Sequence, residues 1–544
     1  MDRIQDFKFK GKTSTCRNRR RENNFELRRK KRFEQAQKRR NLVEDENTSV
    51  VDAENAAGNN NNNNNNNSSN NDLAIVKKQQ SKDGKPLPTL ENLPAAVHTI
   101  LTSDDFDAAF EATQLCRRTL AKSEYLEDGV RMLREMNVLP RLVEFLTVPH
   151  EDLVCEAAWA LTNVASGTSK DTRAVAATGC VPVLVSLVSL ESEKLTEQCL
   201  WCLSNIAGDG AELRDMVLGA SLIERLLPAI HANPGIVTLR TAVWCLSNLC
   251  RFKKPAPNFE LVKHAIPTLV AMVQHEDMDV RSDALWGLSY VSDGDDTRIS
   301  AVLDAGAATQ VVELLASNST RILVPALRCL GNFLSGSDDL AQVSIDAGCL
   351  PHLTTLTQHK SNRVRKDACW ALSNIAAGTP EQARTILEAQ AVPSLVDCLT
   401  NGEFRVRKEA CFCLRNLVDT CSDSEVEYIV SQGVIPALVD VLSLQDVAIL
   451  EQALSALHRV LKAAAAAVPV GSPNACAEWI EECGGVDTIE QLQQHENDAV
   501  YELALGIVEE FFSEEEEEVA DMAPQATSSG FAFAAPTQHT QFAL

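Results

Sequence analysis

The stretch EQCLWCLSNIAGD at residues 197–209 decides the fold, because versions of it recur at a fixed interval. Its Trp aligns with four others, and the intervals between the five are 42, 43, 42 and 84 residues, the last being twice 42. The aligned residues are Trp159, Trp201, Trp244, Trp286 and Trp370. Two further positions continue the period without a Trp, at Arg328 and Phe412. A period near 42 is the length of an armadillo or HEAT repeat.

A second residue follows each aligned position after four residues. These partners are Asn163, Asn205, Asn248, Tyr290, Asn332, Asn374 and Asn416. Residues i and i+4 lie on one face of a helix, so each pair projects from the same side of its helix. We call the two sets together the ladder. If its helices line one wall of a stack of repeats, successive pairs stand about 10 Å apart, the usual spacing of packed helices.

Gly and Pro residues divide each repeat. Gly179, Gly348 and Gly433 each precede a Pro by three residues, and the Pro residues are Pro140, Pro182, Pro267, Pro351, Pro393 and Pro436. Gly ends a helix and Pro is tolerated in the first turn of the next. We therefore expect a short helix, a break, an apolar helix such as residues 181–190, a charged turn and a long helix such as residues 195–207. One such unit cannot cover its own apolar face, so the units must stack.

The sequence predicts an all-α fold, a right-handed superhelical solenoid of about ten armadillo repeats over residues 86–512. Residues 1–43 form a basic arm, and residues 44–85, with the Asn run 59–67, read as a disordered linker. Residues 513–544 begin with an acidic run at 514–518 and read as a disordered tail.

Charge is divided unevenly in this chain of 544 residues with a net charge of −24. Residues 1–43 carry 16 Lys and Arg against 5 Asp and Glu, so the rest of the chain has a net charge of −35. An acidic body attracts cationic ligands and repels nucleic acid. No apolar secretory signal or run of about 18 apolar residues occurs, so we expect no membrane span.

The 17 Cys residues show no disulfide framework and mostly lie in apolar helical runs, as Cys155, Cys202 and Cys245 do. They read as small buried side chains in a reducing compartment. Cys199 and Cys202 form a C-x-x-C inside a helix, without a second pair at metal spacing. Nucleotide-binding and nucleophile motifs are absent from the sequence, and we expect no enzyme, no cofactor and no metal.

The residue types of the ladder suit an extended basic peptide. An Asn amide both donates and accepts, so it can hold a peptide backbone without reading its sequence. Trp faces accept the stems and charged heads of Lys or Arg. Acidic residues near the ladder would meet those heads, namely Asp209, Asp283, Asp367 and Glu409. A buried, unsatisfied Asn would cost about 1–3 kcal/mol, so we expect the ladder Asn side chains to lie on an exposed face.

The ladder together with the basic arm resembles the importin-α (karyopherin-α) family. The arm reads RIQDFKFKGK at residues 3–12, and RNRRRENNFELRRKKR and KRRNL follow at 17–32 and 38–42. The repeats read EAAWALTNVASGT at 156–168 and KDACWALSNIAAG at 366–378. The resemblance implies a nuclear import adaptor that binds basic nuclear localisation signals in a concave groove. It also implies importin-β as the partner of the arm, and recycling by an exportin with Ran-GTP through the acidic C-terminal repeat.

The resemblance also implies roles for individual residues. The major signal site would be Trp159, Asn163, Ser166, Gly167, Thr172, Trp201, Asn205, Asp209, Trp244 and Asn248. The minor site would be Asp283, Arg328, Asn332, Trp370, Asn374, Glu409 and Asn416. Lys38, Arg39 and Arg40 would form an autoinhibitory segment that competes for the major site. Such a protein would shuttle between cytoplasm and nucleus through nuclear pores.

One departure from the family and three other functions stay open at this point. Phe412 stands where the family has another Trp, and its smaller face weakens the expected minor site. An armadillo scaffold for signalling or adhesion would share the architecture but gives no reason for the basic arm. A subunit of an enzyme lacks catalytic groups here. A nucleic-acid binder would use residues 1–43 and show a steep salt dependence.

Overall fold

The computed structural model describes residues 86–189, 191–252, 254–469, 472–512, 525–527 and 530–532. The expectations for the arm, the linker and most of the tail, including Lys38, Arg39 and Arg40, lie outside these residues. The chain divides into two compact units, Met1–Ala389 and Gln390–Leu544. Each unit is described by itself.

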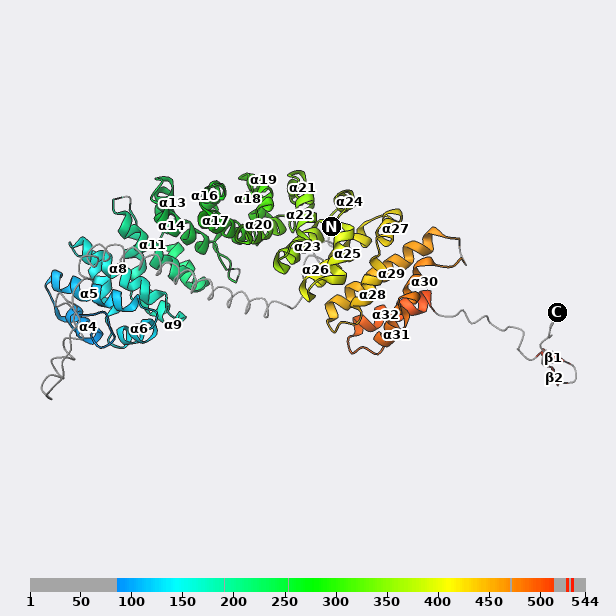
Figure 1. The fold of residues 1–544 in the computed structure, drawn as a ribbon, viewed down its shortest axis with the longest axis horizontal. Coiled ribbons are helices and arrows are strands. Elements are labelled where there is room, and N and C mark those ends of the chain that lie inside the picture. The colour runs from blue at the N-terminus through cyan, green and yellow to red at the C-terminus, as the bar shows by residue number, and fades with distance from the viewer. Residues whose placement is uncertain are drawn as a thin grey trace, which may run out of the picture. The chain divides into compact units, whose positions relative to one another are not determined.

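The first unit is a row of helical repeats (Figure 1). Its first repeat has two helices, α4 (Leu93–Thr102) and α5 (Phe106–Leu120). The next repeats have three helices each, some with a 3₁₀ turn: α6 (Leu126–Glu135), α7 (Leu139–Glu144), η1 (Phe145–Thr147) and α8 (Glu151–Ala165); α9 (Ser169–Ala177), α10 (Cys180–Leu187) and α11 (Glu193–Ala207); α12 (Ala211–Gly219), α13 (Leu222–His231) and α14 (Ile236–Leu249).

The row continues with α15 (Phe259–Val262), η2 (Lys263–Ala265), α16 (Ile266–Val273) and α17 (Met278–Val291); α18 (Asp296–Asp304), α19 (Ala307–Glu313), η3 (Leu314–Ala316) and α20 (Thr320–Phe333); α21 (Asp338–Asp346), α22 (Cys349–Leu356) and α23 (Asn362–Ala376). Helix α24 (Pro380–Glu388) is the last of the first unit. We call the last helix of each repeat, α5, α8, α11, α14, α17, α20 and α23, its third helix. Successive third helices pack against one another, which aligns residues 42 apart along one wall.

The second unit contains α25 (Val392–Asn401), α26 (Phe404–Thr420), α27 (Asp423–Ser431), α28 (Val434–Val441), α29 (Val447–Ala467), α30 (Ala475–Glu482), α31 (Gly485–Leu492) and α32 (Asp498–Phe511). The short strands β1 (Gln525–Thr527) and β2 (Gly530–Ala532) pair antiparallel, with Gln525 opposite Ala532. The described helices make ten repeats in all, and the expected armadillo solenoid is confirmed.

The break between the first and second helix of a repeat follows from one left-handed residue. Gly179, Gly348 and Gly433 have φ of 77°, 84° and 83°, as the Gly-to-Pro spacing predicted. Asn137 makes the same turn at φ 53°, and in two further repeats it is made by Ser221 at φ 58° and Gln390 at φ 51°. Only Gly adopts this conformation at no steric cost, so these three turns carry backbone strain.

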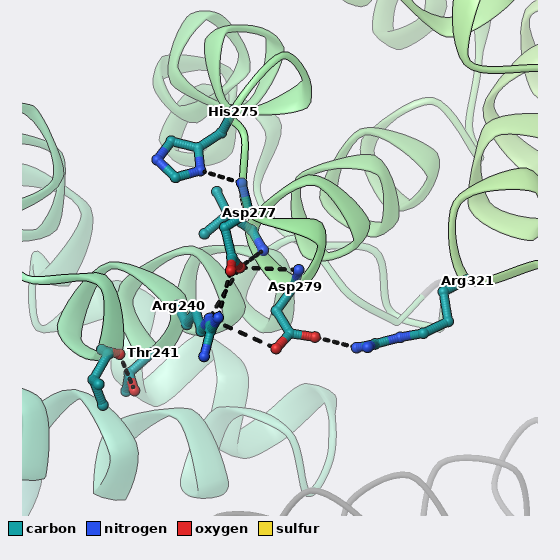
Figure 2. A network of polar contacts seen from close by, with 8 residues as sticks. Arg240, Thr241, His275, Asp277, Asp279 and Arg321 are labelled. Carbon is teal, nitrogen blue, oxygen red and sulfur yellow. Dashed lines mark hydrogen bonds and ion pairs between the residues drawn. The ribbon is translucent and has the colours of Figure 1, made fainter. Parts of the chain in front are cut away.

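The starts of three neighbouring third helices are joined by charged side chains (Figure 2). Arg240 Nε donates to Asp277 Oδ1 at 2.9 Å and lies 3.6 Å from Asp279 Oδ2. Arg321 of the next third helix also binds Asp279. The hydrogen bond from Arg240, with backbone N–H donors, lowers the pKa of Asp277 to about 2. The network links α14, α17 and α20.

The positions of the cysteines confirm the prediction that they lie in the core. Of the 16 that the structure describes, 15 are buried, and the C-x-x-C pair is among them. Burial raises the pKa of the Cys245 thiol to about 12, so this sulfur is a poor nucleophile and metal ligand. Across the described residues no group of three or more His, Cys, Asp or Glu is placed to hold a metal. Nor is any single described helix long and apolar enough to cross a membrane.

Candidate functional site

The ladder Trp residues stand on consecutive third helices. Trp159 lies on α8, Trp201 on α11 and Trp244 on α14. The rings of Trp201 and Trp244 meet edge to face, with 6.3 Å between their centroids and 80° between their planes. The stacking of repeats therefore places indoles from neighbouring helices side by side, as the period of 42 predicted.

The expectation that the ladder Asn side chains lie on an exposed face is wrong. Asn163, Asn205, Asn248, Asn332 and Asn374 are only 1 to 8 % exposed. Each amide reaches the repeat before it and donates to a backbone carbonyl near the end of that third helix. The acceptors are Arg117 O at 3.2 Å, Thr162 O at 3.3 Å, Ser204 O at 3.2 Å, Ser289 O at 2.8 Å and Gly331 O at 2.9 Å, in chain order.

The prediction of an exposed face assumed that a buried Asn amide would lack a hydrogen-bond partner. These bonds supply that partner. The carbonyls of Arg117, Thr162 and Ser204 also accept the backbone N–H four residues later along the chain, so there the Asn amide adds a second donor to the same oxygen. The bonds use only the amide nitrogen, so the Oδ1 acceptor of each Asn is not engaged in them. One amide can thus join two repeats and still offer an acceptor.

The other residues assigned to the major site cluster where α8 ends. Ser166 donates its hydroxyl to Asn163 O at 2.7 Å. Thr172 is fully buried and donates to Ala165 O at 3.0 Å, so its Oγ keeps acceptor capacity. Asp209, at the end of α11, accepts a hydrogen bond from Ser169 Oγ at 2.7 Å. A hydroxyl at the start of α9 and a carboxylate after α11 therefore already meet at this position.

Gly167 occupies a tight place in the same turn. A Cβ added there would lie 2.8 Å from Asp171 Oδ2, whose carboxylate caps the start of α9 with Thr168. A side chain at residue 167 would therefore push against the cap of the following helix.

The acidic residues predicted beside the ladder differ from one another. Asp283 and Asp367 are 3 % and 2 % exposed, and Asp367 accepts from Lys366 Nζ at 2.5 Å. Glu409 and Asn416 are half-buried on α26 in the second unit. Asp367 is thus already neutralised by its neighbour, whereas Asp209 is only half-buried.

Two arginines of the chain itself stack on ladder indoles. The Arg117 guanidinium lies 4.0 Å from the ring centroid of Trp159, and that of Arg328 lies 5.1 Å from the ring of Trp370. Arg328 was predicted as a site residue, but Arg117 was missed. It falls 42 residues before Trp159, so extending the period by one step would have found it.

In the middle of the ladder, two residues of the ladder itself stack on each other. Trp286 stacks on Tyr290, four residues later on the same helix, at 5.8 Å between centroids. Further along the ladder, the indole Nε1 of Trp370 is buried and has no hydrogen-bond partner among the described residues. The ladder is therefore uneven, as the replacement of Asn by Tyr290 and of Trp by Arg328 suggested.

Comparisons with known proteins agree with the repeat fold. A family model described as the importin beta binding domain matches residues 3–114, and an atypical Arm repeat model matches residues 474–525. The armadillo/beta-catenin-like repeat matches residues 127–166, 168–208, 255–293, 337–377, 379–419 and 422–467.

Relatives match most of the chain. Importin subunit alpha-4 of Arabidopsis thaliana is 38% identical over 467 residues, covering 84% of this chain and 86% of that protein. Importin subunit alpha-B of Dictyostelium discoideum is 45% identical over 448 residues, covering 81% and 86%. A crystal structure of an engineered protein matches with a TM-score of 0.70 and 26% identity, covering 77% of this chain and 98% of that one.

Fold and matches together define an armadillo-repeat solenoid that carries an importin-beta-binding segment. With relatives at these identities over most of their length, the chain belongs to the importin-α family. Members of this family are adaptors of nuclear import, and the chain belongs to that class.

Proposed function

We propose that this adaptor binds basic nuclear localisation signals along the ladder and couples them to importin-β through residues 1–43. The observation that carries the proposal is the Arg117 guanidinium, 4.0 Å from the Trp159 ring centroid. A ladder indole thus already holds the group that an arginine of a signal would bring. Arg328 over Trp370 repeats this arrangement five repeats further on.

In the major site, Trp159, Trp201 and Trp244 bind the stems of ligand Lys or Arg side chains. The Oδ1 atoms of Asn163, Asn205 and Asn248 accept from the peptide backbone, because the inter-repeat bonds leave this acceptor out. Asp209, with Ser166, Gly167 and Thr172 beside it, takes the ammonium of a central lysine. The Asp209 carboxylate matches an ammonium, which has three donors and no acceptor.

The minor site holds a second basic cluster. Trp370 binds a side-chain stem, and Asn332 and Asn374 hold the backbone. Arg328 on the same wall and Asp283 complete the set in the first unit, and Glu409 and Asn416 lie on α26 of the second unit. The smaller ring of Phe412 makes this the weaker site.

The basic arm regulates the major site by competing for it through Lys38, Arg39 and Arg40. The sequence predicts a flexible linker after the arm, and about 45 residues of such a linker span roughly 35–40 Å, enough to reach the second to fourth repeat. At an effective concentration in the millimolar range, the arm competes with a signal until importin-β binds it. Binding of an exportin with Ran-GTP at the acidic C-terminal repeat then recycles the adaptor, which shuttles between cytoplasm and nucleus.

Fluorescence anisotropy with one-part and two-part basic peptides tests the groove. Trp159→Ala and Asn205→Ala should abolish binding of the one-part peptide, whereas Trp479→Ala, outside the ladder, should leave it unchanged. Asn205→Ala also removes the bond to Thr162 O, so its melting curve must be compared with that of wild type. Normal binding by both folded ladder variants would rule the groove assignment out.

Autoinhibition has its own test. In the full chain, substituting Lys38, Arg39 and Arg40 together by Ala should strengthen peptide binding about tenfold or more, because the competing segment is removed. Deleting residues 1–72 should give a similar gain. Equal affinities for wild type and both variants would disprove the competition.

A further inference from the structure

The first ladder position holds an arginine that is fixed from both sides. Arg117 on α5 is 5 % exposed, and its guanidinium faces the Trp159 indole at 4.0 Å. Its Nε donates to Glu156 Oε2 at 2.8 Å and its Nη2 to Glu156 Oε1 at 3.3 Å. Gln114 Nε2 also donates to Glu156 Oε1, at 3.4 Å. The guanidinium is thus stacked and bound by a fork of two carboxylate oxygens, the full recognition set for an arginine.

Arg328 provides a contrast within the same chain. Its guanidinium also lies over a ladder indole, Trp370, but at 5.1 Å, and it is half-buried. The acidic residue three positions before Trp370 is Asp367, which corresponds to Glu156, and it is bonded to Lys366 instead. The structure therefore locks Arg117 with a carboxylate and holds Arg328 by stacking.

We propose that Arg117 is a built-in substitute for a ligand arginine, which ends the peptide site at Trp159 and limits how many basic side chains a bound signal can place. Its position supports this role, because Arg117 stands exactly one repeat before Trp159 on the same wall. Glu156 is then the counter-ion of a latent subsite that the chain fills itself. The inference rests on the proposed function, since it concerns the end of that same groove.

Removing the arginine should open this subsite to the ligand. In Arg117→Ala, one face of Trp159 loses its stacked cation, and Glu156 loses its guanidinium partner and keeps only the long bond from Gln114. Both groups can then accept an arginine from the peptide. A basic peptide lengthened by four residues at either end, with one Arg moved through the added positions and Ala elsewhere, scans for it. Anisotropy should show one register in which Arg binds about tenfold tighter than Ala, whereas wild type should show a ratio near 1 in every register.

Three further variants of the full chain serve as controls. Arg117→Ala with Glu156→Gln keeps the space but lacks the counter-ion, so the gain should fall to about threefold. This double variant also buries no unpaired carboxylate, and it serves if Arg117→Ala fails to fold. Arg328→Ala vacates a different indole and should leave the scan of the one-part peptide flat. Glu156→Gln alone keeps Arg117 stacked and should give no gain.

The outcomes separate the two proposals. A wild-type protein that does not bind the unextended peptide contradicts the groove itself. Normal binding of that peptide by wild type and by a folded Arg117 variant, with a flat scan in both, overturns the inference alone. A gain of similar size in Arg328→Ala would also overturn it, because the effect would then not depend on the end of the ladder.

Discussion

Asn205, which the sequence predicts to be a binding residue, also holds two repeats together through its side-chain amide. It donates to Thr162 O of the preceding repeat at 3.3 Å and is 3 % exposed. Thr162 O also accepts from Ser166 N at 3.0 Å, so the Asn205 amide adds a bond between repeats, which contributes about 0.5–1.5 kcal/mol. Substitution of a ladder Asn should therefore weaken the stack as well as any ligand contact.

Gly331 is the residue at which a single methyl group should do the most damage. A Cβ there would lie 1.9 Å from Cζ3 of Trp370. Gly331→Ala must displace the indole of the minor site, and overpacking of this kind costs about 1–3 kcal/mol. We expect a lower midpoint in urea and a changed near-ultraviolet circular dichroism spectrum.

Gly506 provides the control for this change, because it lies inside the last helix of a repeat with no atom within 4 Å of an added Cβ. Gly506→Ala should be neutral or stabilise by up to about 1 kcal/mol, since Ala favours helix. Equal effects of the two substitutions would contradict the packing argument.

At the scale of elements, the same turn is built from different residues. Gly306 makes it at φ 84° with open space around its α-carbon, and Ser221 makes it at φ 58°. A non-Gly residue in this region costs roughly 1–2 kcal/mol, part of which Gly loses again in backbone entropy. The repeats therefore share the position of this turn but not the residue type that makes it.

Ser221→Gly should therefore stabilise the chain by about 0.5–1 kcal/mol, and Gly306→Ala should destabilise it by about 1 kcal/mol. Urea denaturation followed by circular dichroism measures both. A loss of stability in Ser221→Gly would show that its side chain contributes more than the strain costs.

The charged network at the starts of α14, α17 and α20 makes stability depend on pH. Arg240 and backbone donors lower the pKa of Asp277 from 3.8 to about 2. A lowered pKa in the folded state stabilises the fold above pH about 4, and this contribution is lost as pH falls toward 2. Asp277→Asn should cost about 1 kcal/mol near neutral pH, after allowance for solvent screening of this partly exposed pair, and little of that cost should remain at pH 2.

Denaturation midpoints of wild type and Asp277→Asn across pH 2 to 7 check this dependence. Asn retains an oxygen for the bonds from Asp279 N and Val280 N that start α17, so the substitution isolates the charge. Asp128→Asn, in an exposed pair with Arg131, should change little at any pH. A cost for Asp277→Asn that persists at pH 2 would assign the effect to packing.

At the scale of the whole molecule, charge separates the arm from the rest. Residues outside 1–43 have a net charge of −35, and this field should speed the approach of basic peptides. The association rate should fall about tenfold between 50 and 500 mM salt, with a smaller change in the dissociation rate. Stopped-flow measurements check this, and a peptide with half the charge should show a shallower slope. A rate independent of salt would exclude steering.

The sequence by itself determined the repeat, its helices and the order of the ladder, because a period of 42 with Gly and Pro at fixed offsets leaves one way to bury the apolar faces. It also predicted the buried cysteines and the uneven ladder around Tyr290 and Arg328. The tertiary structure alone decided what each ladder side chain contacts. Asn205 binds the carbonyl of Thr162 and Arg117 fills a face of Trp159, since these partners come from the neighbouring repeat. Spacing within a helix shows which residues share a face, and only stacking shows what that face meets.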